Sequence, residues 1–224
     1  MSKHALIVQG GWEGHTPKES AEVFAPLLEA EGFDVTISDT LDSYTDAALM
    51  RSLDLIIPIW TMGQITNEQC DGLDHAVRAG CGLAGFHGGM LDAFRTNTMY
   101  QWMCGGQWVA HPGNCIPNYR VDITNSDHPI TRGLSHFTLQ ETEQYYCHID
   151  PGVNVLCKTS FTEEAAIGEE YTGLYPLGVT IPYAWTRHWA KGKVFAASWG
   201  HTYKDFDEPT AQEIVRRGMV WAGR

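Results

Sequence analysis

The sequence predicts an α/β fold in which a parallel sheet carries helices on both faces. In the first half of the chain, short apolar runs alternate with segments that have helical apolar spacing. This alternation is typical of strand–helix–strand units, whose right-handed crossovers bring the carboxyl ends of the strands to one edge. Ligands of such sheets bind at that edge. The length of 224 residues fits one domain of the larger kind, so we expect residues 1–224 to form a single domain.

The expected elements of the first half follow in chain order. Ala5–Val8 is a short apolar run that ends before two glycines. Lys18–Glu31 has apolar residues at helical spacing and stops at Gly32. The next elements are a strand over Phe33–Ile37, a helical turn over Ala47–Arg51, a strand over Leu53–Ile59, a helix over Thr66–Ala79 and a strand over Gly82–Phe86.

The second half changes character, because its strands follow one another without long helices between them. The expected strands are Tyr119–Thr124, Phe137–Ile149, Asn154–Thr159, Val179–Trp189 and Lys193–Ser198. Lys191–Lys193 is expected to form a hairpin turn before the last of them. A final helix is expected from about Glu208 to Trp221. We interpret this half as a β-rich insertion near the edge of the parallel sheet.

Composition and charge exclude several classes of partner. The formal net charge of −12 repels phosphate backbones and anionic lipid surfaces, so neither nucleic acid nor membrane is an expected partner. No apolar run approaches the ~18 residues of a membrane span. The six cysteines form no Cys-x-x-Cys pair, and we expect them to be reduced in a cytoplasmic protein. A homo-oligomer is a reasonable default, since closed symmetry is common.

The glycine-rich segment Gly85–Gly89 follows a predicted strand with the spacing of a nucleophile elbow. In α/β hydrolases and amidotransferases, this sharp turn lifts a Ser or Cys above the sheet edge. Here the lifted residue is His87. Imidazole is poorly suited to be the nucleophile of acyl transfer, but it is a good metal ligand or proton carrier. The structural alternative is an ordinary tight turn with an incidental histidine.

Histidines follow three of the expected parallel strands. His15 follows the first strand, His87 the fourth and His201 the last. Because the ends of parallel strands share one edge, we expect these three side chains to lie together. A surface or core position is the alternative for each histidine taken alone.

Two further candidates are His111 and Glu143. In a strand, Glu141 and Glu143 point to the same face, so both could line a pocket or both could be solvated. His148 belongs either to the same region or to a loop. Two or three imidazoles and a carboxylate suit zinc, and suit iron, manganese or nickel less well.

Such a site supports two kinds of chemistry. A metal with an open position would polarise a carbonyl or hydroxyl and activate water. Without a metal, the same residues would form an acid–base site for proton transfer next to a carbonyl. Tryptophans, among them Trp12 and Trp185, are numerous beside these motifs and could stack on sugar rings. The structural alternative is that they are core and rim residues.

The ordered motifs resemble the ThuA-like family, named for trehalose utilisation, within the class I glutamine amidotransferase-like superfamily. The motifs that carry this resemblance are the glycine-rich start leading to His15, Gly85–Gly89, Gly105-Gly106 with His111-Pro112, Asp127–Leu134, Glu143–Tyr145, Ala184–Thr186, and Gly192–Phe195 leading to Gly200-His201. The resemblance implies a flavodoxin-like sheet with its active site at the elbow and without the amidotransferase cysteine. The family pattern often has an Asp immediately before the glutamate, where this chain has Thr142.

The resemblance also implies a role in sugar catabolism, including that of trehalose and keto-sugar derivatives. We therefore expect a metal-dependent enzyme that acts on a small-molecule sugar carbonyl or hydroxyl by isomerisation, epimerisation or hydrolysis. The expected metal is zinc, and the expected ligands are His87, His201 and Glu143. The expected catalytic groups are His15, His111 and Glu143, although His15 could instead be a further ligand and His111 could contact the substrate or complete the ligand shell. The expected sugar contacts are Trp12, Trp185 and Tyr145.

Two other functions stay open at this point. One is an amidotransferase-like hydrolase that uses another nucleophile, although Cys81 lies before the turn and Cys104 has no elbow around it. The other is a non-catalytic sugar-binding protein.

Overall fold

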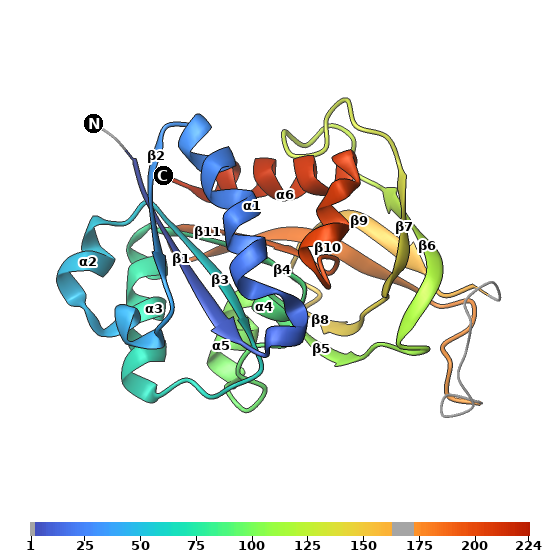
Figure 1. The fold of residues 1–224 in the computed structure, drawn as a ribbon, viewed down its shortest axis with the longest axis horizontal. Coiled ribbons are helices and arrows are strands. Elements are labelled where there is room, and N and C mark those ends of the chain that lie inside the picture. Colours follow the sequence, from blue (N-terminus) through green and yellow to red (C-terminus); the bar gives the residue numbers. More distant parts are fainter. Residues whose placement is uncertain (1–2, 163–172) are drawn as a thin grey trace.

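The computed structural model describes residues 3–162 and 173–224, and within them nine strands form one sheet (Figure 1). In spatial order the strands are β2 (Phe33–Ser38), β1 (Lys3–Gly11), β3 (Leu55–Thr61), β4 (Gly82–Phe86), β11 (Gly192–Ala197), β10 (Thr180–Trp189), β9 (Asn154–Ser160), β6 (Cys115–Ile123) and β7 (Phe137–Glu143). The first five are parallel, and each of the last four is antiparallel to its neighbour. The predicted α/β fold class is confirmed.

Helices cover both faces of the parallel half of the sheet. Helices α1 (Pro17–Ala30) and α6 (Pro209–Ala222) contact each other on one face, and α3 (Asn67–Ala79) and α5 (Thr98–Cys104) contact each other on the other (Figure 1). The shorter helices are α2 (Ala47–Ser52), α4 (His87–Leu91), η1 (Glu13–His15), η2 (Leu41–Thr45) and η4 (Tyr203–Asp207). In the central strand β1, Leu6, Ile7 and Val8 are fully buried, as continuous apolar runs in two-sided sheets require.

Local sequence signals set the helix ends. Thr66 accepts from the Gln69 backbone and Gln69 accepts from the Thr66 backbone, which forms the capping box of α3. Helix α5 was not expected from the sequence, although it has comparable signals. The Asn97 side chain caps its start, and Gly105 ends it in the left-handed conformation at φ 80°.

The prediction of a single strand over Phe137–Ile149 is wrong. Strand β7 ends at Glu143, and the chain leaves the large sheet to form β8 (Tyr146–Ile149), which pairs with β5 (Gly106–Ala110). The backbone is already irregular at Glu141, which has a φ of 50°. The consequence is that Glu143 lies where one sheet ends and the other begins.

A pair of buried tyrosines stabilises this break. The hydroxyl of Tyr119 donates to the Glu143 carbonyl oxygen at 3.1 Å, and the hydroxyl of Tyr183 accepts from the Tyr145 backbone N–H at 3.1 Å. The Tyr183 hydroxyl in turn donates to that of Tyr119 at 3.0 Å. Buried backbone groups that leave a ladder need other partners, and these hydroxyls supply them.

The antiparallel strands extend the large sheet rather than form a sheet of their own, and only β5 and β8 pair separately among the described residues. Nowhere in residues 3–162 and 173–224 is a helix both long enough and apolar enough to cross a membrane.

Candidate metal centre

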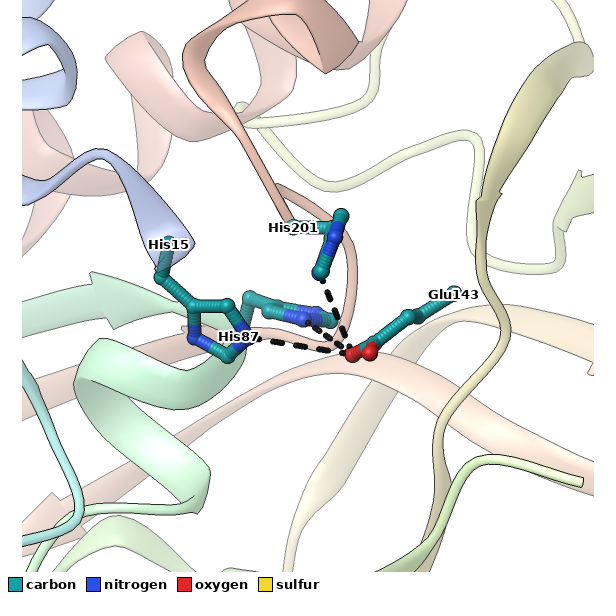
Figure 2. A group of neighbouring side chains, drawn as sticks. All are labelled: His15, His87, Glu143 and His201. Atoms are coloured by element: carbon teal, nitrogen blue, oxygen red, sulfur yellow. Dashed lines mark hydrogen bonds and ion pairs between the residues drawn. The ribbon is translucent and has the colours of Figure 1, made fainter. Parts of the chain in front are cut away.

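Three histidines from separate parallel strands lie together at one edge of the sheet. His15 ends η1 after β1, His87 begins α4 after β4, and His201 follows β11. Figure 2 shows these side chains facing one another and the side chain of Glu143. One potential ligand atom from each of the four residues lies within 4.8 Å of all the others. The topology of the sheet therefore brings residues distant in sequence to one place.

A single carboxylate oxygen is the common neighbour of the histidines. Glu143 Oε2 lies 3.2 Å from His87 Nε2, 3.2 Å from His201 Nδ1, 3.3 Å from His111 Nδ1 and 3.8 Å from His15 Nε2. Glu143 is 6% exposed and His87 is 1% exposed, so this contact lies out of water. Burial of so many polar groups needs mutual compensation or a bound ion.

The elbow that carries His87 depends on its glycines. His87 has a φ of 45°, which is strained for a residue with a side chain and is found at functional turns. A Cβ added to Gly88 would lie 2.4 Å from His15 Nδ1, and one added to Gly89 would lie 2.8 Å from Ile59 Cα. The glycine at position 88 therefore lets His15 approach His87.

The second ring nitrogen of each of the three histidines also has a partner. His87 Nδ1 lies 3.0 Å from the Ser198 carbonyl oxygen, and His15 Nδ1 lies 2.8 Å from Thr61 Oγ1. His201 Nε2 lies 3.8 Å from Cys115 Sγ. Metal-binding histidines usually donate their other N–H to such a group, which fixes the ring and its tautomer.

The tautomer of His87 creates a specific electrostatic problem. A carbonyl oxygen can only accept, so His87 Nδ1 carries the proton that it donates to Ser198. Burial lowers the pKa of His87 to about 3, so Nε2 carries a lone pair at neutral pH. Burial raises the pKa of Glu143, but contact with the four surrounding histidine rings lowers it far below its ordinary value. Two lone pairs then face each other at 3.2 Å, and a cation held by both atoms would remove the repulsion.

The donor atoms fit a divalent metal in two further respects. His201 Nδ1 is buried and makes no hydrogen bond of acceptable geometry with any described residue, although it lies near Glu143 Oε2. Two ligand atoms that each lie 2.0–2.1 Å from a tetrahedral zinc are about 3.3 Å apart. The distances from Glu143 Oε2 to His87 Nε2 and to His201 Nδ1, both 3.2 Å, are close to this value. The buried His and Glu cluster could therefore hold a metal.

His111 and Trp12 are more exposed than the buried members of this cluster. The side chain of His111 is 27% exposed, and that of His87 is 1% exposed. Trp12 is 46% exposed, and its ring centroid lies 4.7 Å from that of His15. Both residues are therefore accessible to a molecule that approaches the cluster from solvent.

Two of the expected sugar contacts have other surroundings. Trp185 is fully buried, and its Nε1 donates to the Cys104 carbonyl oxygen at 3.0 Å, so its ring has no exposed face for the expected contact with a sugar. Tyr145 is 1% exposed and stacks on His87 with ring centroids 3.7 Å apart. It supports the His87 ring.

The other polar candidates, Glu141 and His148, are exposed and lie outside the buried cluster. Glu141 is exposed although Glu143 is buried, because the irregular backbone at Glu141 breaks the strand alternation. His148 is exposed on β8 opposite Gln107. The sequence did not point to Thr61, the hydrogen-bond partner of His15, because no distinctive motif surrounds it.

The buried cysteines do not favour an amidotransferase nucleophile. Cys81 is 1% exposed and Cys104 is fully buried. Burial raises the pKa of Cys81 to about 12 and that of Cys104 still further. A thiolate is the reactive form, so neither thiol is suited to attack a substrate.

Comparisons with known proteins bear on the fold and the family of this chain. No curated protein matches this sequence. A ThuA-like protein from Bacteroides uniformis has a TM-score of 0.78 at 19% identity, over 98% of this chain and 91% of its own. A ThuA-like protein from Parabacteroides merdae has a TM-score of 0.72 at 15% identity, over 99% and 90%. A cytoplasmic protein from Salmonella typhimurium has a TM-score of 0.65 at 11% identity, over 99% of each chain.

These structural similarities are too low in identity to show more than the fold. The family model described as "ThuA: Trehalose utilisation" matches residues 4–222, which is nearly the whole chain. This protein therefore belongs to the ThuA family.

Proposed function

We propose that this protein is a metal-dependent enzyme of carbohydrate metabolism that acts on a sugar carbonyl or hydroxyl. The observation that carries the proposal is the group of His15, His87, Glu143 and His201, whose ligand atoms lie within 4.8 Å of one another. The metal we propose is zinc, because three imidazoles and one carboxylate suit it. The lone pairs of His87 Nε2 and Glu143 Oε2, which point toward each other, are a separate argument for a cation.

The side chains divide into holding and proton-moving roles. His87, His201 and Glu143 would hold the metal, with His15 as a further ligand. When bound, such a metal polarises a carbonyl or hydroxyl oxygen and lowers the pKa of water. His111 would move a proton at Nδ1, because this nitrogen faces Glu143 without a hydrogen bond and its ring is partly exposed. A proton carrier must reach both the reacting group and solvent.

The sugar substrate is supported by the family and by the aromatic surroundings. The family model is described as trehalose utilisation. Trp12 offers an exposed indole beside His15, and the Trp108 ring centroid lies 5.5 Å from that of His111. We place the enzyme in the cytoplasm, in line with the description of the Salmonella typhimurium protein of similar fold.

Metal analysis of the purified protein tests the metal centre. We expect about one metal ion per chain in the unmodified protein and loss of metal in His87→Ala and His201→Ala. His148→Ala is the matched control, because this histidine is exposed on β8. Stoichiometric metal that persists in both ligand variants would overturn the proposed ligand set.

A substrate screen tests the reaction. Oxidised and unoxidised disaccharides would be incubated with the metal-loaded protein, and products would be identified by mass. We expect turnover of a keto-sugar and a loss of at least about 100-fold in His111→Ala, as for removal of a general acid or base. Sugar binding by calorimetry without turnover of any compound would instead indicate a non-catalytic sugar-binding protein.

A further inference from the structure

The buried carboxylate of Asp205 has no place in the proposed ligand set. Asp205 lies in η4 and is 7% exposed. Its Oδ2 accepts hydrogen bonds from Thr142 Oγ1 at 2.9 Å, from the His201 backbone N–H at 3.0 Å and from the Gly200 backbone N–H at 3.1 Å. All three donors are neutral groups. They compensate in part for removing a carboxylate from water.

The three donors belong to two segments that carry proposed ligands. Thr142 precedes Glu143 at the end of β7, in the antiparallel half of the sheet. Gly200 and His201 follow β11, in the parallel half. One oxygen atom of Asp205 therefore links the strand that carries Glu143 to the backbone segment that carries His201. A shift of either segment would lengthen a bond to this oxygen.

The charge of Asp205 also complements the proposed centre. A divalent cation with neutral imidazoles and the single Glu143 carboxylate keeps one net positive charge. One further carboxylate close by makes the buried group neutral, and burying a neutral group costs less than burying a charged one. Asp205 is the buried carboxylate that contacts the His201 backbone.

We infer that Asp205 is a positioning residue of the metal centre, which sets the separation of Glu143 and His201 and balances the charge of the bound ion. This inference rests on the proposed function. It also gives Thr142 a role, since a hydroxyl at this position can donate to Asp205, whereas a carboxylate there would repel it.

Cobalt(II) binding to the purified, metal-stripped protein tests the inference, because cobalt reports its ligand geometry by visible absorption. Asp205→Asn keeps the shape and removes the charge. We expect its cobalt affinity to fall by about 10- to 100-fold, as for other residues that orient metal ligands, with an altered absorption spectrum. Asp207→Asn is the matched control, an exposed residue of the same η4 helix, and should bind cobalt as the unmodified protein does.

Thr142→Val is the second variant and decides the matter if Asp205→Asn does not fold. It keeps the charge and removes one hydrogen bond, so we expect a loss of several-fold in affinity. If Asp205→Asn folds and its cobalt affinity and spectrum are unchanged, the inference is overturned and the proposed function stays intact. If only Thr142→Val folds, the same result in that variant overturns the inference. An unmodified protein that binds neither cobalt nor zinc would overturn both.

Discussion

The parallel and antiparallel halves of the large sheet supply the candidate metal centre in different ways. The parallel half supplies His15, His87 and His201, each just past the carboxyl end of a strand. The antiparallel half supplies Glu143, at a point where the chain leaves one sheet for another. The comparison teaches that the first group follows from topology, whereas the position of Glu143 depends on individual side chains.

Those side chains can be named. The Glu143 carbonyl accepts from Tyr119, and the preceding Thr142 donates to Asp205. Gln144 donates to Thr159 Oγ1 at 2.8 Å and so fixes the residue that follows. Strand ends in the parallel half need fewer such contacts, because ladder bonds on both sides already hold β1, β3 and β4.

The largest expected effect tests whether the antiparallel half contributes an essential ligand. Glu143→Gln removes the carboxylate charge that the surrounding histidines contact. We expect metal affinity to fall by at least about 1,000-fold, or about 4 kcal/mol. Metal content after dialysis measures it. Glu141→Gln is the matched control, because this carboxylate is exposed two residues away. Unchanged affinity in Glu143→Gln would mean that the parallel half binds the metal alone.

The next effect compares the cores of the two halves. Leu6→Ala in the central strand β1 should cost about 3 kcal/mol of unfolding free energy, because β1 has strands on both sides and a cavity there cannot collapse. Leu139→Ala in the edge strand β7 should cost about 2 kcal/mol, since one side of that strand is free to relax. Denaturant unfolding of both variants measures the difference. Equal costs would show that the halves are equally rigid.

A smaller effect is expected from the tyrosine pair. Tyr119→Phe removes the hydroxyl that donates to the Glu143 carbonyl and that accepts from the Tyr183 hydroxyl, and we expect a loss of about 1 kcal/mol. The exposed Tyr203 provides a control, whose change to phenylalanine should alter stability by less than about 0.5 kcal/mol. If Tyr119→Phe is as stable as the control in thermal unfolding, the break in the strand does not depend on these hydroxyls.

The smallest effect concerns charges on α6 that link the halves. Glu213 pairs with Arg216 and Arg217, and Arg216 also pairs with Glu31, the residue that follows α1. Arg217 donates to the Arg132 carbonyl between β6 and β7. Hydrogen bonds from Arg216, more than offsetting partial burial, lower the pKa of Glu213 to about 2.

A depressed carboxyl pKa stabilises the fold above the unfolded pKa, and that contribution is lost as pH falls towards the folded pKa. We expect Glu213→Gln to cost about 0.5 kcal/mol at pH 6, because the pair is partly solvated. The difference from the unmodified protein should shrink between the ordinary glutamate pKa of 4.5 and the lowered value of about 2. A difference that grows as the solution becomes more acidic would contradict this linkage.

Much of the parallel half could be predicted from the sequence. Apolar runs, the glycine at the end of α3 and the elbow around His87 act over a few residues, and the crossover rule then brings three histidines together. The antiparallel half could not be predicted in the same way. Apolar residues occupy odd positions before Gln144, at Phe137 and Leu139, and again after it, at Tyr145, Cys147 and Ile149, so the pattern gives no sign that the chain changes sheets there. Trp185 likewise has a sequence context that fits either a core or a surface position.

The amino-acid sequence by itself determined the fold class, the strand ends that carry His15, His87 and His201, and the membership of residues 4–222 in a known family. These depend on local periodicity and on ordered motifs, which can be read along the chain. Only the tertiary structure decided that Glu143 meets the histidines, that Trp185 is buried and that Asp205 joins the two ligand-bearing segments. Their contacts join side chains far apart along the chain, whose positions depend on how the whole sheet packs.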